Sequence, residues 1–233
     1  RFNQRMQKAM SLSIAGDAAL QVSRKAIDIF KSPVKTAMDF EAQMAKVGAV
    51  SRATNSDMGR LTQTARKLGA TTTFSASQAA QGMEFLGMAG FNTGEIIKTM
   101  PGLLNLAKAG TLGLGRASDI ASDIMSGFGL KAEDMGRISD VLTATFTRSN
   151  TTLGMLGETM KFVAPVAKTA GLSIEETSAF AGILANSGIK ASQAGTTLRA
   201  MLLRLGAPGN KAREILDGLG ITLEDSDGNL RNV

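Results

Sequence analysis

The sequence of 233 residues contains no cysteine, no histidine, no tryptophan and no tyrosine. Without cysteine the chain cannot form disulfide bonds, and without cysteine and histidine it lacks the ligands of ordinary zinc sites. The absence of histidine also excludes a Ser-His-Asp triad and histidine acid–base catalysis. Any catalysis would need carboxylates or lysine. We therefore expect no enzyme activity, no metal and no other cofactor or small-molecule ligand.

Long apolar runs are missing as well. No stretch approaches the roughly 18 to 20 apolar residues that a membrane-spanning helix needs, and no secretory signal is present. The chain begins at Arg1 instead of a methionine and ends at Val233, within a stretch that resembles a hairpin. We therefore expect a fragment of a longer protein.

What the sequence does contain favours helices. Hydrophobic residues make up 43% of the chain and charged residues 20%, which is ordinary for a globular protein. The apolar residues are mainly alanine, leucine, isoleucine and 13 methionines, and the aromatics are ten phenylalanines. This composition predicts an all-α fold.

The first part of the chain reads as a basic helical arm. Residues 1–35 hold seven basic and two acidic residues, out of a net charge of +6 for the whole chain. Apolar residues recur every four positions from Phe2 to Val22, which predicts one amphipathic helix with a kink at Pro33. The basic charge is either a solvated helix face or a surface attracted to DNA or to an acidic protein wall. Because one apolar stripe needs a partner, we expect self-association, with interface residues Phe2, Met6, Met10, Ile14, Val22, Met38 and Met44.

A second pattern marks turns between helices. A glycine followed by an apolar residue recurs four times, at Gly90, Gly129, Gly171 and Gly220. In each copy an acidic residue follows the apolar residue by three or four positions. The glycine can close one helix in the left-handed conformation, and the following residues can cap the next helix through a capping box. The expected turn residues are Gly90, Phe91, Asn92, Glu95, Gly129, Leu130, Gly171, Leu172, Ser173, Glu176 and Gly220, with Asp227 and Gly228 in a final β-turn.

The spacing of these signals predicts repeated helical hairpins of about 40 residues. Similar helix starts occur at Ala76, Ala117, Gly154 and Ala191, which are 41, 37 and 37 residues apart. We therefore expect a long N-terminal helical arm over residues 1–48, a short helix and connector over 49–74, and a hairpin-repeat core over 75–220. A β-hairpin element is expected to begin in residues 221–233.

Three acids are the best catalytic candidates that the composition leaves. Glu84, Glu95 and Glu158 lie among apolar neighbours, and paired carboxylates carry out glycoside hydrolysis. However, no second carboxylate can be paired with any of them from the sequence, and each is better interpreted as a capping or surface residue. An envelope-active muralytic module is therefore the weaker alternative. A helical-repeat protein-binding scaffold is another, although the repeat period is irregular.

Several segments together resemble the conserved core region of phage tail tape-measure proteins. The resemblance covers roughly residues 37–233 and is specific as an ordered set, whereas each segment alone is weak. The segments are Asp39–Val47, Leu68–Gly82, Leu106–Gly110, Ala164–Ala167, Gly171–Glu176, Gly188–Lys190, Ala194–Arg199 and Asp227–Asn229.

This resemblance implies a structural protein of a bacteriophage tail or of a phage-derived particle. Such a protein sets tail length during assembly, occupies the lumen of the tail tube, and leaves ahead of the DNA at genome ejection. It also implies a virion tail location, in the tube lumen or the tail tip, after assembly in the bacterial cytoplasm. The implied partners are further copies of the chain, as a trimer or a hexamer, tail tube and baseplate or tail-tip proteins, a tail assembly chaperone, and DNA as a candidate contact. The family implies no catalytic residues in this region.

Overall fold

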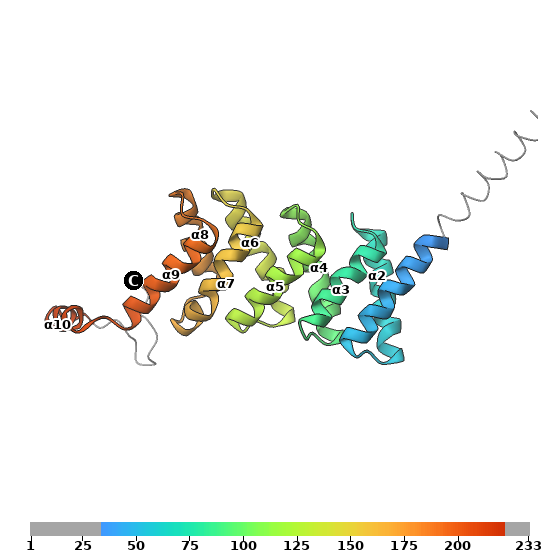
Figure 1. Cartoon of the computed structure of the whole chain (residues 1–233), viewed down its shortest axis with the longest axis horizontal. Helices are drawn as coiled ribbons and strands as arrows, with labels where there is room; N and C mark the ends of the chain where they lie inside the picture. The colour runs from blue at the N-terminus through green and yellow to red at the C-terminus, as the bar shows by residue number, and fades with distance from the viewer. Residues whose placement is uncertain (1–33, 222–233) are drawn as a thin grey trace, which may run out of the picture.

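The computed structural model describes residues 34–221, in which helices are joined by short turns and no strand is present (Figure 1). The first helical segment covers residues 34–51. The later helices are α2 (Asn55–Thr71), α3 (Ala76–Met88), α4 (Thr93–Ala109), α5 (Leu114–Phe128), the short 3-10 helix η1 (Ala132–Asp134), α6 (Met135–Arg148), α7 (Leu153–Thr169), α8 (Ile174–Asn186), α9 (Ala191–Gly206) and α10 (Asn210–Gly218).

The helices form two layers of stacked hairpins. One layer consists of α2, α4, α6 and α8, and the other of α3, α5, α7 and α9, because each helix packs against the second helix along the chain. Figure 1 shows the hairpins side by side along the long axis of the molecule. Each hairpin cannot bury its apolar residues alone, and stacking produces one continuous core that runs from Phe40 to Leu198.

Local sequence signals explain where these helices begin and end. Ser75, Asn92 and Ser173 each cap a helix and complete a capping box with the Gln or Glu three residues later. Gly90, Gly129 and Gly171 have φ of +91°, +66° and +79°, which glycine adopts without steric cost. These three glycines close α3, α5 and α7, and they reverse the chain from the second layer into the first.

Some helices extend further than their sequence predicts. The first segment continues to residue 51, and α2 continues through Gly69 to Thr71, so helix takes up most of residues 49–74, where we expected a short helix and a connector. Burial of Leu61, Ala65 and Leu68 stabilises α2 and outweighs its weak end signals. Pro101 and Pro165 likewise lie inside α4 and α7 and do not end them.

The predicted fold class included a C-terminal β-hairpin, and this part of the prediction is wrong. No strand is present in residues 34–221, and Ile221 follows α10 without entering one. Residues 222–233, with Asp227 and Gly228, lie outside the described residues. A two-stranded hairpin by itself is only marginally stable in water, so a turn signal with few apolar residues beside it is a weak basis for predicting a β element. The described chain is therefore all-helical without a β element.

Candidate functional site: the interfaces between stacked hairpins

Close backbone contacts join successive hairpins in the second layer. Gly115 of α5 lies against the ring of Phe85, and Gly157 of α7 lies against Ile120. At Gly195 of α9 an added Cβ would lie 2.5 Å from the carbonyl oxygen of Thr159. At Gly195 no side chain fits without movement of a helix, so this glycine sets how closely α9 approaches α7.

Polar side chains connect the same hairpins on the surface. Nζ of Lys98 lies 2.6 Å from Glu133, and Nη2 of Arg116 lies 2.5 Å from Glu158. At the first interface, the amide of Gln43 donates to Glu84 at 2.5 Å. These partners are 35, 42 and 41 residues apart, which is about one repeat. Each contact therefore joins one hairpin to the next.

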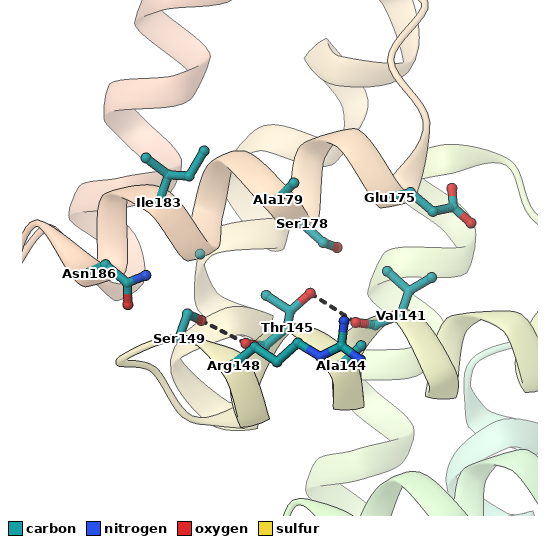
Figure 2. A pocket seen from close by; sticks show the side chains of 11 residues that line it. Val141, Ala144, Thr145, Arg148, Ser149, Glu175, Ser178, Ala179, Ile183 and Asn186 are labelled. Carbon is teal, nitrogen blue, oxygen red and sulfur yellow. Dashed lines mark hydrogen bonds between the residues drawn. The ribbon is translucent and has the colours of Figure 1, made fainter.

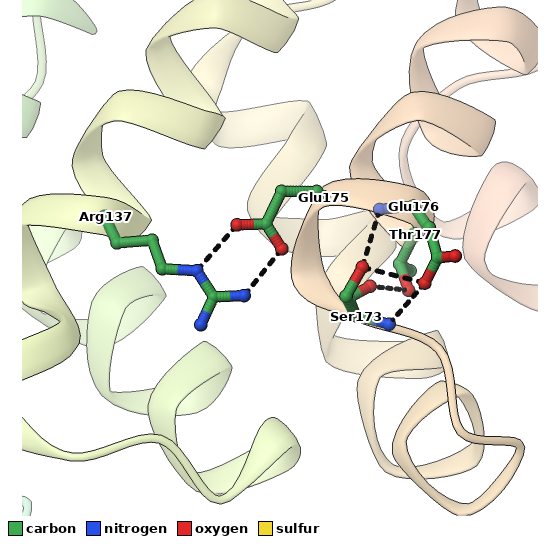
Figure 3. Close-up of polar contacts among 5 residues, drawn as sticks. All are labelled: Arg137, Ser173, Glu175, Glu176 and Thr177. Carbon is green, nitrogen blue, oxygen red and sulfur yellow. Dashed lines mark hydrogen bonds and ion pairs between the residues drawn. The ribbon is translucent and has the colours of Figure 1, made fainter.

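The most complete of these contacts joins α6 to α8. Nε and Nη2 of Arg137 donate to the two carboxylate oxygens of Glu175 at 2.6 and 2.7 Å (Figure 3). The hydrogen bonds from Arg137 hold the pKa of Glu175 below its ordinary value, and the carboxylate raises the pKa of the guanidinium in return. The side chains are 47% and 45% exposed, so solvent screens the pair and limits its contribution to stability.

The turn before α8 positions Glu175. The backbone N–H of Glu176 donates to Oγ of Ser173 at 3.2 Å, and the carboxylate of Glu176 accepts from the backbone N–H of Ser173 at 2.8 Å (Figure 3). The N–H of Leu172 donates to the carbonyl of Ala167 at 2.9 Å. This bond gives a partner to a carbonyl that the end of α7 would otherwise leave without one. One short segment thus ends α7, begins α8 and brings Glu175 opposite α6.

A groove of about 370 Å³ lies between α6 and α8 (Figure 2). Small residues line much of it, including Ala144, Ala179 and Gly182. Figure 2 shows the side chain of Ser178 directed from α8 toward α6, and its Oγ is buried without a hydrogen-bond partner among the described residues. The Arg137–Glu175 contact bridges α6 and α8 at their first turns, and the N–H of Asn150, just after α6, donates to Asn186 at the end of α8.

The three candidate acids all have structural partners. Glu84 accepts from Gln43, Glu95 completes the capping box with Asn92, and Glu158 pairs with Arg116. Within residues 34–221, no group of three or more acidic side chains is placed to hold a metal ion, and no helix is long and apolar enough to cross a membrane.

The predicted interface residues fall into two groups. Met38 is 64% exposed, whereas Met44 is 4% exposed and packs into the core of its own chain. Phe2, Met6, Met10, Ile14 and Val22 lie outside the described residues. The sequence patterns did not identify the contacts between hairpins, although oppositely charged residues about one repeat apart were a usable signal.

Stacked hairpins, joined by close contacts at glycines and by surface ion pairs, define a helical-repeat architecture in residues 34–221. The model of the family described as "Phage-related minor tail protein" matches residues 62–233, so the chain belongs to this family. This finding confirms the resemblance to phage tail proteins that the sequence motifs indicated.

Two relatives carry names that agree with this family. The chain is 42% identical over 197 residues to the "Tape measure protein" of Pneumococcus phage Dp-1, a match that covers 84% of this chain and 17% of the relative. It is 36% identical over 179 residues to the "Probable tape measure protein" of Escherichia phage P2, which covers 77% of this chain and 22% of the relative. The chain therefore spans about a fifth of the length of these relatives. No solved structure matches it.

Proposed function

We propose that this chain is the stacked helical segment of a tape-measure protein. The whole protein sets tail length during assembly, occupies the lumen of the tail tube, and is released ahead of the DNA at genome ejection. The observation that carries the proposal is the 42% identity to the tape measure protein of phage Dp-1 across 84% of the chain. Membership of the minor tail protein family supports a place in the virion tail.

The stacked architecture allows the hairpins to separate from one another in order along the chain. Each hairpin packs mainly against its immediate neighbours, so hairpins can leave the stack one at a time from an end. The ion pairs between hairpins are exposed, and such pairs contribute only about 0.2 to 1 kcal/mol each. These features suit a chain that must pass along a narrow tube.

The proposed partners are other copies of the chain, tube proteins, baseplate or tail-tip proteins and a tail assembly chaperone. Self-association as a trimer or hexamer uses the apolar stripe of residues 1–48, of which Met38 is exposed. Sedimentation of the chain as a monomer at micromolar concentration would count against this self-association. We expect the basic residues of the arm to contact an acidic lumen wall or the DNA end. Salt screens such contacts, so association with tube protein that is equally strong in high salt would contradict this expectation.

Particles before and after ejection test lumen occupancy and release. In intact virions the chain is expected to resist external protease, whereas a tail surface protein in the same sample is cleaved. After ejection is triggered, the chain is expected to be absent from emptied particles that retain their tube protein. Cleavage in intact tails, or full retention after ejection, would contradict the proposal. Mass spectrometry of both preparations measures the outcome.

A further inference from the structure

Helix α9 begins in a backbone conformation that is costly for its first residue. Ala191 has φ +51°, in the left-handed region where a Cβ lies too close to the following carbonyl oxygen. Arg52 and Thr111 also have positive φ, but each follows the end of a helix, where this conformation ordinarily closes the last turn. Ala191 is instead the first residue of a helix. Its strained conformation therefore does not serve to close a helix.

No local signal supports the start of α9. Lys190 occupies the cap position and makes no side-chain hydrogen bond to the helix, whereas Ser173 caps α8 and Thr152 caps α7. A strained first turn without a cap persists only where contacts with the rest of the fold hold it in place.

The contact that holds this turn comes from Thr159 of α7. The side chain is buried, and its Oγ1 donates to the carbonyl oxygen of Ala191 at 3.0 Å. The backbone carbonyl of the same residue lies against Gly195, one turn further along α9. The buried residues of α9 are Ala194, Gly195 and Leu198, all in the first half of the helix. The attachment of α9 to the stack is therefore centred on Thr159.

The hydroxyl of Thr159 has a second acceptor in its own helix. Its Oγ1 also lies 3.0 Å from the carbonyl oxygen of Met155, four residues earlier in α7. A hydroxyl has one hydrogen, which these two carbonyl oxygens share. When α9 moves away, the hydrogen bond to Met155 remains, so the separation leaves no hydroxyl without a partner. Relief of the strain at Ala191 favours the separated state further.

We propose that the start of α9 is a strained joint that Thr159 holds closed, and that α9 separates from α7 at this joint while the earlier hairpins stay folded. Local openings of this kind occur where a fold is least stabilised. In a protein that unstacks as it leaves a tail tube, the joint supplies a defined point of opening. That use rests on the proposed function, whereas the opening itself in solution does not.

Hydrogen exchange of the full chain, measured by mass spectrometry on peptides from α9 and from α5, tests the joint. Ala191→Gly removes the strain and is expected to slow exchange in the first half of α9 about fivefold, because glycine adopts a positive φ without steric cost. Ser192→Gly is the matched control at the next residue, which is exposed and has no positive φ. It should quicken the exchange, since glycine weakens an ordinary helical position. The proposal is overturned unless Ala191→Gly alone slows the exchange.

Removal of the hydroxyl tests the role of Thr159. Thr159→Val keeps the shape of the side chain and loses the donor, so exchange in α9 is expected to become about fivefold faster while exchange in α5 does not change. Thr159→Ser keeps the donor and should quicken α9 less. Equal acceleration in α5 and α9 would show that Thr159 stabilises the whole stack, and would overturn the proposal.

The exchange results and the fate of the protein at ejection are independent. If the variants behave as expected but emptied particles retain the protein, the proposed function fails and the joint stands. If the protein leaves the tail but the variants do not alter exchange in α9 as expected, the joint fails and the proposed function stands.

Discussion

At the residue scale, glycine supplies both the turns and the close contacts of this protein. Gly171 has φ +79°, a conformation that is costly for residues with a Cβ, and Gly195 lies against the backbone of Thr159. The first role is visible in the sequence, because a glycine followed by an apolar residue and a cap is a local signal. The second role is not visible, because it depends on a helix from the preceding hairpin.

Substitution of Gly171 tests the turn. Gly171→Val is expected to lower the free energy of unfolding by about 1 kcal/mol or more, because valine is strained in the left-handed conformation. Gly171→Asn is the matched control and should cost less, since asparagine tolerates this conformation better. Urea unfolding followed by circular dichroism measures both. Equal stability of the valine variant and the unsubstituted chain would contradict the geometry.

The Arg137–Glu175 pair gives a pH-dependent prediction. The pKa of Glu175 is lowered by folding, so the pair stabilises the protein above the ordinary value of 4.5 and loses this contribution as the pH falls through the lowered pKa. Glu175→Gln is therefore expected to cost about 0.5 kcal/mol at pH 7 in low salt. The difference should vanish at strongly acidic pH and shrink in 1 M salt. A cost that is independent of both would assign the effect to packing.

At the scale of helices, the sequence predicted the features that depend on local signals better than those that depend on tertiary contacts. The capping boxes at Asn92 and Ser173 mark real helix starts, because caps act within one turn of chain. Helix α2 is longer than the short helix expected within residues 49–74, because burial of its apolar side chains extends it past Gly69. The pair of Arg137 and Glu175 was missed because its residues are 38 positions apart. The irregular repeat period reflects helices of 13 to 17 residues in otherwise equivalent hairpins.

Stacking of α9 on α7 can be tested through Gly195. An alanine there would place its Cβ 2.5 Å from the carbonyl oxygen of Thr159, so one helix must move. Gly195→Ala is expected to cost about 1 to 3 kcal/mol, as overpacked interiors do. Gly59→Ala, in α2 with no atom within 4 Å of the added Cβ, should instead stabilise by about 0.5 to 1 kcal/mol. Stabilisation by both substitutions would contradict the close contact.

At the scale of the whole molecule, the two-layer stack determines how much length each repeat adds. Stacked helices lie about 8 to 10 Å apart, so one hairpin adds about 10 Å along the stack. The hairpin that runs from Gly90 to the residue before Gly129 contains 39 residues, and these residues would span about 58 Å if they formed one continuous helix. A ruler made of stacked hairpins is therefore much shorter per residue than an extended one.

Tail length after removal of two hairpins is the most direct test of this account. Deletion of residues 90–170 from the phage gene removes 81 residues and joins Ala89 to Gly171, which keeps one turn glycine and the order of the layers. Duplication of the same residues is the reciprocal variant if the deletion prevents assembly. Mean tail lengths in electron micrographs are expected to change by about 20 Å. A length that does not change would contradict the ruler, and a change of about 120 Å would contradict a stacked segment in the assembled tail.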